Sequence, residues 1–425
     1  MTEAPVTTTK FKEGLTLVKI DLPHFHSITN LLVIRGGSRY EDESNHGIAH
    51  FLEHMVFKGT RSFTSPREVA ESIEGIGGYF NAWTWYDTTA YWNVVPENYY
   101  QRGLQLPLEL AFWPLLRSAD LERERGVIIE EIRRIQDDPA SFVGDLSQEV
   151  TFAGHPLGRS VIGTEASISA MTLKQFGQFR DNHYHPGQAY LITVGNLKGK
   201  NIDAEVEQLL AGLTTKPVSK FEKFAGSSRK GVKLLNKATD QTHFILSVVD
   251  PSFALTTKER FVASVLNTVL GSGMSSRLFM NIREEKGLAY SISSSLTPYE
   301  DTGEISIYGG VNTTKIASAL AAVDEELVRL SSEPVSPVEL TKAKSLLTGA
   351  FDLASDRPLE LASWYGTSRL LGMKETREQA KAAIAAVTPD DLQTLAGRVF
   401  AKDRQTLAVI GPYESEQIFR QFLEL

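Results

Sequence analysis

The chain has 425 residues, no cysteine, and a formal net charge of -8 from 44 Lys and Arg against 52 Asp and Glu. Its length exceeds the ~250–300 residues at which one hydrophobic core stops growing, so we expect two domains. The acidic balance, without a basic stripe, argues against nucleic acid as a partner. The lack of cysteine excludes disulfides, thiolate metal sites and cysteine nucleophiles, so any metal must be held by histidines and carboxylates.

The first twenty residues, MTEAPVTTTKFKEGLTLVKI, lack the basic start and the apolar core of a secretion signal. No apolar run approaches the ~18 residues of a membrane span. We therefore expect a cytoplasmic protein of the bacterial type with no membrane partner. A mature organellar chain would have the same features.

In the first half of the chain, apolar residues alternate where we predict strands and recur with a helical period where we predict helices. In chain order the predicted elements are strands at 15–20 and 27–37, a helix within 46–60, a short helix at 66–75, a hairpin at 79–95, and helices from about residues 98 and 120. Strands and helices thus come from one continuous stretch, which is typical of an α+β domain.

The second half predicts a similar series. Its elements are a strand at 242–250, a helix near 258–270, a shorter helix ending at 286, strands at 288–296 and 303–311, and helices from about residues 314 and 338. We interpret the chain as two similar α+β domains from an internal duplication, each an antiparallel sheet with helices packed on one side.

Between the halves lies a segment rich in lysine, serine and glycine, LTTKPVSKFEKFAGSSRKG, at 213–231. We predict an N-terminal domain over 1–215, a linker over 216–231 and a C-terminal domain over 232–425. The second half has a single histidine, His243, so metal chemistry is expected in the first half only.

The helix within 46–60, HGIAHFLEHMVFKGT, has a polar face with three groups suited to metal chemistry. At about 100° per residue, His50, Glu53 and His54 fall opposite the apolar residues. Histidines at i and i+4 stand one above the other and can bind one ion, and Glu53 flanks them within reach of a water. The order HxxEH is the inverted form of the HExxH zinc motif. The alternative is a solvated face that carries two histidines by chance.

The ends of this helix also follow from the sequence. Ser44 or Asn45 is placed to cap its first turn, and Gly59 is placed just past its last turn. These two signals bound the motif within a single short helix.

Zinc in a catalytic site has about three protein ligands, so a third ligand is required. In DLERERGVIIEEIRRIQDDP, Glu124 and Glu131 lie within the apolar stripe, whereas Glu130 lies about 100° away. A carboxylate on a buried face is costly unless it is paired. We therefore predict Glu131 as the third ligand and Glu124 as its inward-facing supporter. The alternative is that both glutamates bond to arginines at the edge of the stripe. The stripe consists of Leu121, Val127, Ile128, Ile132 and Ile135.

Several of these segments resemble peptidase family M16, the pitrilysin or inverzincin metallopeptidases, and specifically the half-size subunits of the mitochondrial processing peptidase type. The segments are HFLEHMVFKGT, FNAW, LERERGVIIEEI, HPLGRSVIGT and GSGMSSRLFMNIREEKGLAYSIS. The resemblance implies that His50, His54 and Glu131 bind one zinc ion per chain, that Glu53 is the general base, and that Glu124 supports catalysis by orienting a ligand.

The same resemblance implies residues that bind substrate. Asn81 and Ala82 match an edge-strand pair to which an extended peptide adds by backbone hydrogen bonds. Arg283 and Tyr290 match a pair that contacts the substrate backbone from the C-terminal domain. From the residues alone, Asn81 and Ala82 are ordinary hairpin residues, Arg283 is a solvated helix residue, and Tyr290 faces a core.

The motif and the resemblance together imply a zinc metallopeptidase that cleaves peptides or unfolded segments bound in extended form within a closed chamber. The alternatives are a non-catalytic scaffold or peptide-binding subunit of the same fold, and a metal-independent chaperone-like binder. Because the chain keeps both the zinc motif and the Arg283–Tyr290 pair, we expect a homodimer, with a heterodimer of related subunits as the alternative. The histidines of DNHYH, His183 and His185, are interpreted as a surface turn.

Overall fold

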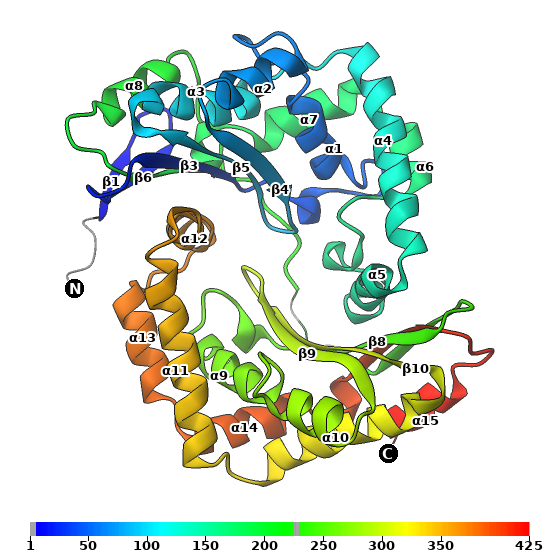
Figure 1. Ribbon diagram of the computed structural model, residues 1–425. Coiled ribbons are helices and arrows are strands. Elements are labelled where there is room, and N and C mark those ends of the chain that lie inside the picture. The colour runs from blue at the N-terminus through cyan, green and yellow to red at the C-terminus, as the bar shows by residue number, and fades with distance from the viewer. Residues whose placement is uncertain (1–5, 225, 227–228, 425) are drawn as a thin grey trace. The chain divides into compact units, whose positions relative to one another are not determined.

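The computed structural model describes residues 6–224, 226 and 229–424, which form two compact units (Figure 1). The first unit comprises the described parts of Met1–Arg133, Ser160–Glu222 and Ala354–Met373, and the second comprises those of Arg134–Arg159, Lys223–Leu353 and Lys374–Leu425. Each unit therefore includes one segment from the other half of the sequence. The division at 215 and 231 stays a prediction about the sequence halves, and three residues of the predicted linker, 225, 227 and 228, lie outside the described residues.

The first unit is built on a six-stranded sheet in the order β1-β2-β6-β3-β5-β4. Its strands are β1 (Val6–Lys10), β2 (Thr16–Asp21), β3 (Ser27–Ile34), β4 (Tyr79–Thr84), β5 (Thr89–Pro96) and β6 (Ala189–Gly195). β2 and β6 are parallel and the other pairs are antiparallel. The α+β class is confirmed, but the sheet is mixed rather than antiparallel, because β6 inserts between β2 and β3 after a long excursion through helices.

Helices cover both faces of this sheet, which corrects the expectation of helices on one side. On one face, Leu32 of β3 belongs to the core formed with α1, α2 and α3, whereas on the other face its neighbour Leu31 packs with Leu361 and Ala362 of α12. The helices are α1 (Ile48–Val56), α2 (Pro66–Glu74), α3 (Tyr100–Phe112), α4 (Ser118–Asp137), α6 (Glu165–Ala170), α7 (Leu173–His183), α8 (Ile202–Leu209) and α12 (Pro358–Ser363). The last four residues of α4 belong to the second unit.

The second unit's five-stranded sheet, β7-β11-β8-β10-β9, repeats the order of the last five strands of the first unit's sheet. Its strands are β7 (Gly231–Asn236), β8 (Gln241–Val249), β9 (Ala289–Pro298), β10 (Gly303–Asn312) and β11 (Thr406–Gly411). The β7–β11 pair is parallel, like β2–β6, and the remaining pairs are antiparallel. The shared topology supports the internal duplication, with β9 in the edge position that β4 has in the first unit.

One helix from the first half of the sequence packs on the second unit's sheet. Val143 and Leu146 of α5 form a core with Ala408 and Ile410 of β11, and Figure 1 shows the other helices of this unit on the opposite face. The helices are α5 (Pro139–Thr151), α9 (Arg260–Leu270), η6 (Leu278–Glu285, a π-helix), α10 (Ile316–Ser332), α11 (Pro337–Ala354), α13 (Arg377–Ala386), α14 (Pro389–Val399) and α15 (Gln417–Glu424). α5 and α12 are thus exchanged between the halves of the sequence.

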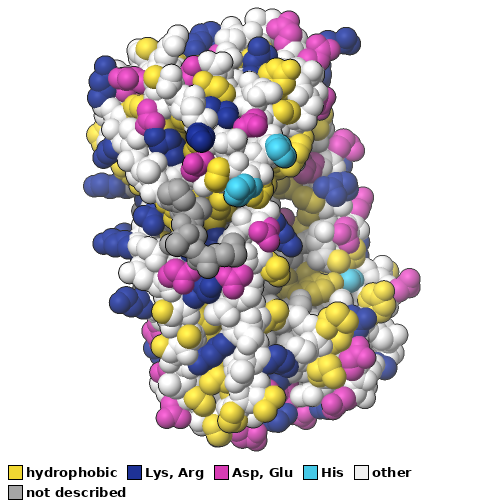
Figure 2. Space-filling view, turned by 60° about the vertical axis from the view of Figure 1, so that its left-hand side comes forward, with side chains coloured by type: hydrophobic (Ala, Val, Ile, Leu, Met, Phe, Trp, Pro, Cys, Tyr) yellow, Lys and Arg dark blue, Asp and Glu magenta, His cyan; other side chains and the backbone are white. Residues whose placement is uncertain are grey.

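The surface in Figure 2 has acidic and basic side chains mixed over the visible face, with no broad field of either sign. Within the described residues, none of the helices is both long enough and apolar enough to cross a bilayer.

Candidate metal centre

The helix α1 is capped by a residue that the sequence did not point to. It begins after Gly47, whose φ of 92° is in the left-handed region that favours glycine. The carboxylate of Glu41 accepts hydrogen bonds of 2.8 Å from the backbone N–H groups of both Gly47 and Ala49. The predicted cap at Ser44 or Asn45 is therefore wrong, because a buried acid from upstream occupies the helix N-terminus.

The two faces of α1 separate as predicted. Its apolar residues are fully buried, and the helix ends at Val56, three residues before Gly59. The polar face is more enclosed than a solvated face would be, since His50 is only 9% exposed. The buried apolar residues are Ile48, Ala49, Phe51, Leu52, Met55 and Val56.

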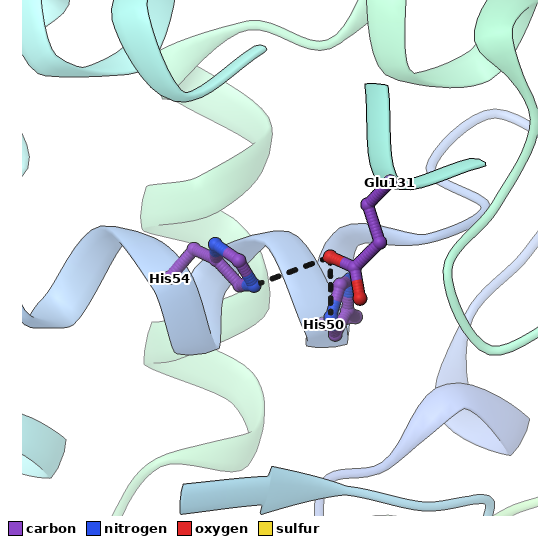
Figure 3. A group of neighbouring side chains, drawn as sticks. All are labelled: His50, His54 and Glu131. Carbon is purple, nitrogen blue, oxygen red and sulfur yellow. Dashed lines mark ion pairs between the residues drawn. The ribbon is translucent and has the colours of Figure 1, made fainter. Parts of the chain in front are cut away.

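The structure brings His50, His54 and Glu131 together (Figure 3). Oε2 of Glu131 lies 3.8 Å from Nε2 of His50 and 3.7 Å from Nε2 of His54. The two imidazole centroids are 4.7 Å apart. The carboxylate thus points at both rings from a second helix, α4, although it lies 77 positions after His54.

These three side chains fit a zinc ion. One atom from each lies within 4.8 Å of the other two, and no second such group of three ligands occurs among the described residues. With bonds of about 2.0–2.2 Å, tetrahedral zinc places neighbouring ligand atoms about 3.3–3.6 Å apart. The two separations from Glu131, 3.8 and 3.7 Å, are slightly longer, so a small inward shift of this carboxylate would bring it to bonding distance.

The electrostatics of His50 suit a metal ligand. Burial, with a smaller effect from neighbouring His54, lowers its pKa to about 3. The ring is therefore neutral and retains a lone pair for a metal.

Glu53 lies on the same face and is held by a residue of the edge strand. The hydroxyl of Thr84 donates a hydrogen bond of 2.6 Å to Oε2 of Glu53. Burial raises the pKa of Glu53 to about 7, against the opposing effect of the Thr84 hydrogen bond, and the charge of Glu131 adds to the rise. A carboxyl group with its pKa near neutrality is suited to both accepting and returning a proton.

Glu124 supports one of the two histidines. It is 5% exposed, with Oε2 3.5 Å from Nδ1 of His54 and Oε1 2.8 Å from Nζ of Lys58. An acid facing Nδ1 favours the tautomer in which Nε2 is free for a metal. In contrast, Nδ1 of His50 is buried and has no hydrogen-bond partner among the described residues.

The predicted faces of α4 are right for its acidic residues and wrong for one apolar residue. Glu131 is half-buried, whereas Glu130 is exposed and pairs with Arg133 at 2.8 Å. Val127, expected in the buried stripe, is 47% exposed. Glu124 forms ion pairs with His54 and Lys58. These pairs do not support the alternative in which the two glutamates bond to arginines.

Asn81 and Ala82 lie on β4, which forms the edge of the first unit's sheet. The Oδ1 atom of Asn81 accepts a hydrogen bond of 2.8 Å from the backbone N–H of Ala82. Figure 1 shows β4 as the outermost strand, and an edge strand can pair with an added peptide.

Arg283 and Tyr290 lie in the second unit, on η6 and β9. The guanidinium of Arg283 is 5.8 Å from the ring centroid of Tyr290, and Tyr290 is 74% exposed, so it does not face a core. The two residues thus lie close together, and Tyr290 is accessible.

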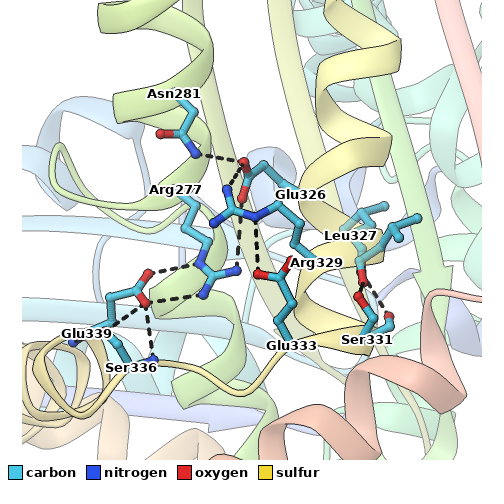
Figure 4. Close-up of polar contacts among 11 residues, drawn as sticks. Arg277, Asn281, Glu326, Leu327, Arg329, Ser331, Glu333, Ser336 and Glu339 are labelled. Atoms are coloured by element: carbon cyan, nitrogen blue, oxygen red, sulfur yellow. Dashed lines mark hydrogen bonds and ion pairs between the residues drawn. The ribbon is translucent and has the colours of Figure 1, made fainter.

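A polar network holds the helix η6 that carries Arg283 (Figure 4). Arg277 binds both carboxylate oxygens of Glu339, at 2.8 and 3.2 Å, and Asn281 donates to Glu326 at 2.6 Å. These contacts join η6 to α10 and to the start of α11.

Three residues of the site were missed by the sequence analysis. Thr84 and Glu41 gave no local signal, because they reach α1 from other elements. Lys58 lies just past the end of α1 and contacts Glu124 of α4, so it too depends on packing between elements.

The surface-turn interpretation of DNHYH is wrong for His185, which is 4% exposed, with Nδ1 accepting from the backbone N–H of Lys216. His183 is half-buried against the rings of Phe179 and Tyr40. Both histidines are thus packed against neighbouring groups of the first unit.

Comparison with known proteins agrees with this geometry. Residues 18–165 match the family described as Insulinase (Peptidase family M16), and residues 170–347 match Peptidase M16 inactive domain. The chain belongs to peptidase family M16. All three candidate ligands and Glu53 lie within the first M16 match, whereas Arg283 and Tyr290 lie within the second.

M16 relatives from several bacteria align over nearly the whole chain. An uncharacterized zinc protease of Rickettsia bellii is 32% identical over 406 residues, covering 95% of this chain and 97% of that protein. An uncharacterized zinc protease of Bacillus subtilis is 32% identical over 403 residues, covering 94% and 97%. Their names support a peptidase and imply zinc.

Solved structures share the M16 fold. A protease from Helicobacter pylori superposes with a TM-score of 0.90 at 22% identity, covering 96% of this chain and all of that one. A peptidase M16 inactive domain from Pseudomonas fluorescens gives a TM-score of 0.88 at 19% identity, covering 96% and 99%. At these identities the likeness concerns the fold alone.

Proposed function

We propose that this chain is a zinc-dependent metalloendopeptidase that hydrolyses peptide bonds in peptides or unfolded segments bound in extended form. The observation that carries the proposal is the convergence of His50, His54 and Glu131 with Glu53 beside them. Two imidazoles and one carboxylate form a donor set typical of catalytic zinc. Glu53 supplies what a metal site alone lacks, a group that can move protons.

Bound zinc would supply Lewis acidity, which polarises a carbonyl and makes a water molecule more acidic. Glu53 would accept the proton of the attacking water and later give it to the leaving amine. Thr84 would hold one oxygen of Glu53, so that the other stays available for the proton. Glu124 would fix the tautomer of His54.

The free edge of β4 would bind the substrate. A peptide added along Asn81 and Ala82 would pair through backbone groups, which favours extended chains over folded ones and allows varied side chains. Arg283 and Tyr290 are proposed as further contacts to the substrate backbone. Enclosure in a chamber remains an expectation from the family resemblance.

The test is cleavage of a peptide pool by the wild type and by Glu53→Gln, with metal analysis of both. We expect zinc in both proteins and hydrolysis only by the wild type. Equal hydrolysis would remove Glu53 as the base. Zinc and peptide binding without hydrolysis by the wild type would favour the non-catalytic subunit, and peptide binding unaffected by chelation would favour the chaperone-like binder.

The name of the second matched region, inactive domain, does not itself favour a non-catalytic protein. That match covers residues 170–347, and the candidate ligands precede it. The candidate donor set thus lies in the other half of the chain.

A further inference from the structure

The short segment Gly37–Glu41, which contains the 3-10 helix η1 (Ser38–Tyr40), contacts two parts of the candidate site at once. One end reaches the helix α1, and the other reaches the hairpin formed by β4 and β5. Neither contact is used in the mechanism above. Both are made by buried groups with short distances.

The contact with α1 is the carboxylate of Glu41. It is 5% exposed and accepts hydrogen bonds from Gly47 and Ala49 through separate oxygens, each 2.8 Å long. Ala49 immediately precedes His50. A carboxylate at a helix N-terminus accepts hydrogen bonds from otherwise unpaired N–H groups and interacts favourably with the helix dipole. Glu41 thereby fixes the first turn of α1, on which His50 lies.

The contact with the hairpin is made by backbone and side chain together. The N–H groups of Ser38 and Arg39 donate to the carbonyls of Trp85 and Tyr86, each at 3.0 Å. Nη1 of Arg39 lies 2.7 Å from Oδ1 of Asp87, and both side chains are buried. Residues 85–87 form the turn that directly follows β4, so these bonds fix the end of the edge strand.

The close approach of segment and hairpin requires glycine at position 37. A Cβ atom there would lie 2.1 Å from the carbonyl oxygen of Trp85 and 2.5 Å from that of Tyr86. Arg39 is held from a third side as well, with its guanidinium 4.0 Å from the ring centroid of Phe221 and 3.1 Å from the carbonyl of Glu222. The segment is therefore tightly packed and has little freedom to move.

We propose that Gly37–Glu41 is a positioning segment that holds the metal-binding helix and the peptide-binding edge strand in one fixed arrangement. Glu41 acts on the metal site through α1, and the Arg39–Asp87 pair acts on peptide binding through β4. The inference rests on the proposed function, because it assigns the two ends of the segment to zinc and to substrate. Its distinctive consequence is that the two effects are separable.

The experiment compares Glu41→Gln and Asp87→Asn with the wild type, using two measurements. Zinc affinity is measured by competition with a chelator. Peptide affinity is measured with zinc bound, in the non-hydrolysing Glu53→Gln background, with a fluorescein-labelled peptide that the wild type cleaves. Glu43→Gln, an exposed acid two residues from Glu41, is the matched control.

We expect Glu41→Gln to lower zinc affinity about tenfold, in the range for residues that orient metal ligands, with peptide affinity unchanged. We expect Asp87→Asn to weaken peptide binding about fivefold or more, since small misplacements are costly, with zinc affinity unchanged. Hydrolysis should show the same split, with KM raised for Asp87→Asn and not for Glu41→Gln at saturating zinc.

Equal loss of both affinities in both variants, or no loss in either, would overturn the proposal. If Asp87→Asn fails to fold, the double variant Arg39→Met with Asp87→Leu removes the ion pair without leaving a buried charge, and the same split is expected. If the wild type binds zinc and cleaves peptide, and the variants have the same zinc and peptide affinities as the wild type, only the positioning role is refuted. A wild type without zinc or hydrolysis refutes the proposed function instead.

Discussion

Thr84 donates a 2.6 Å hydrogen bond to Oε2 of Glu53, joining the last residue of the edge strand β4 to the middle of α1. The proposed base is thus held by the same strand that is proposed to bind the peptide. We expect Thr84→Val to lower kcat about tenfold or more, because a hydrogen bond to a charged group contributes about 1.5–3 kcal/mol. Zinc content should not change, which metal analysis of the purified variant checks. Thr8→Val, at an exposed position of β1 in the same sheet, should retain full activity.

The neighbouring acids Glu130 and Glu131 provide a matched test of the third ligand. Glu131→Gln should lower zinc affinity by at least about a hundredfold, since the loss of outer partners alone costs about 10–100-fold. Glu130→Gln should bind zinc like the wild type, because this side chain is exposed and pairs with Arg133. Chelator competition measures both. Equal affinity in the two variants would remove Glu131 from the ligand set.

Zinc removal should also change stability. Because a ligand that binds only the folded state stabilises it by mass action, zinc at a hundred times its Kd should add about 2.7 kcal/mol. The wild type should therefore melt at a higher temperature with zinc than with chelator, and Glu131→Gln should lose most of that difference. If zinc did not change the melting temperature of the wild type, a zinc site formed by these residues would be contradicted.

A buried acid in the second unit predicts a pH effect on folding. Glu304 is 2% exposed, and burial raises its pKa despite hydrogen bonds from Ser247 and Gln148. Its contribution to stability is fully present below the unfolded pKa of about 4.3 and is lost as pH rises through the folded value. Glu304→Gln should therefore reduce the loss of stability between pH 5 and pH 8, measured by the urea midpoint. The exposed Glu378→Gln should leave the wild-type pH dependence unchanged, and a Glu304→Gln profile identical to the wild type would contradict the assignment.

The network around η6 offers a comparison between a buried and an exposed arginine. Arg277 has 9% of its side chain exposed and Arg329 has 47%, and both pair with Glu326. Arg277→Gln should destabilise the protein by about 1.5–3 kcal/mol, because it removes two charged hydrogen bonds to the partly buried Glu339, while Glu326 keeps Arg329 and Asn281. Arg329→Gln should cost about 0–1 kcal/mol. Urea unfolding at pH 7 distinguishes them, and equal small losses would show that the network contributes little.

The expected homodimer is tested by gel filtration with light scattering. We expect a mass of two chains for the active protein, in keeping with the two-fold symmetry of most oligomers. A fully active monomer would refute this expectation.

Much of the fold was predictable where the evidence is local. The strands and helices from β2 to α4 and from β8 to α11 match the predicted segments to within a few residues, because burial of one face imposes a regular period. The mixed sheets were not predictable, since β6 and β11 join β2 and β7 only through contacts distant in the sequence. The exchange of α5 and α12 between the halves has the same cause.

Some features of the candidate site were likewise predictable from local sequence, and others depended on contacts between elements. Helical periodicity and residue type determined that His50, Glu53 and His54 share a face and that Glu124 and Glu131 turn inward on α4, because a helix fixes the direction of each side chain. Only the tertiary structure decided that Glu131 points at both imidazoles, that Glu41 rather than Ser44 or Asn45 caps α1, and that Thr84 binds Glu53. Each of these contacts joins different elements, so it depends on how those elements pack, which no local pattern of residues encodes.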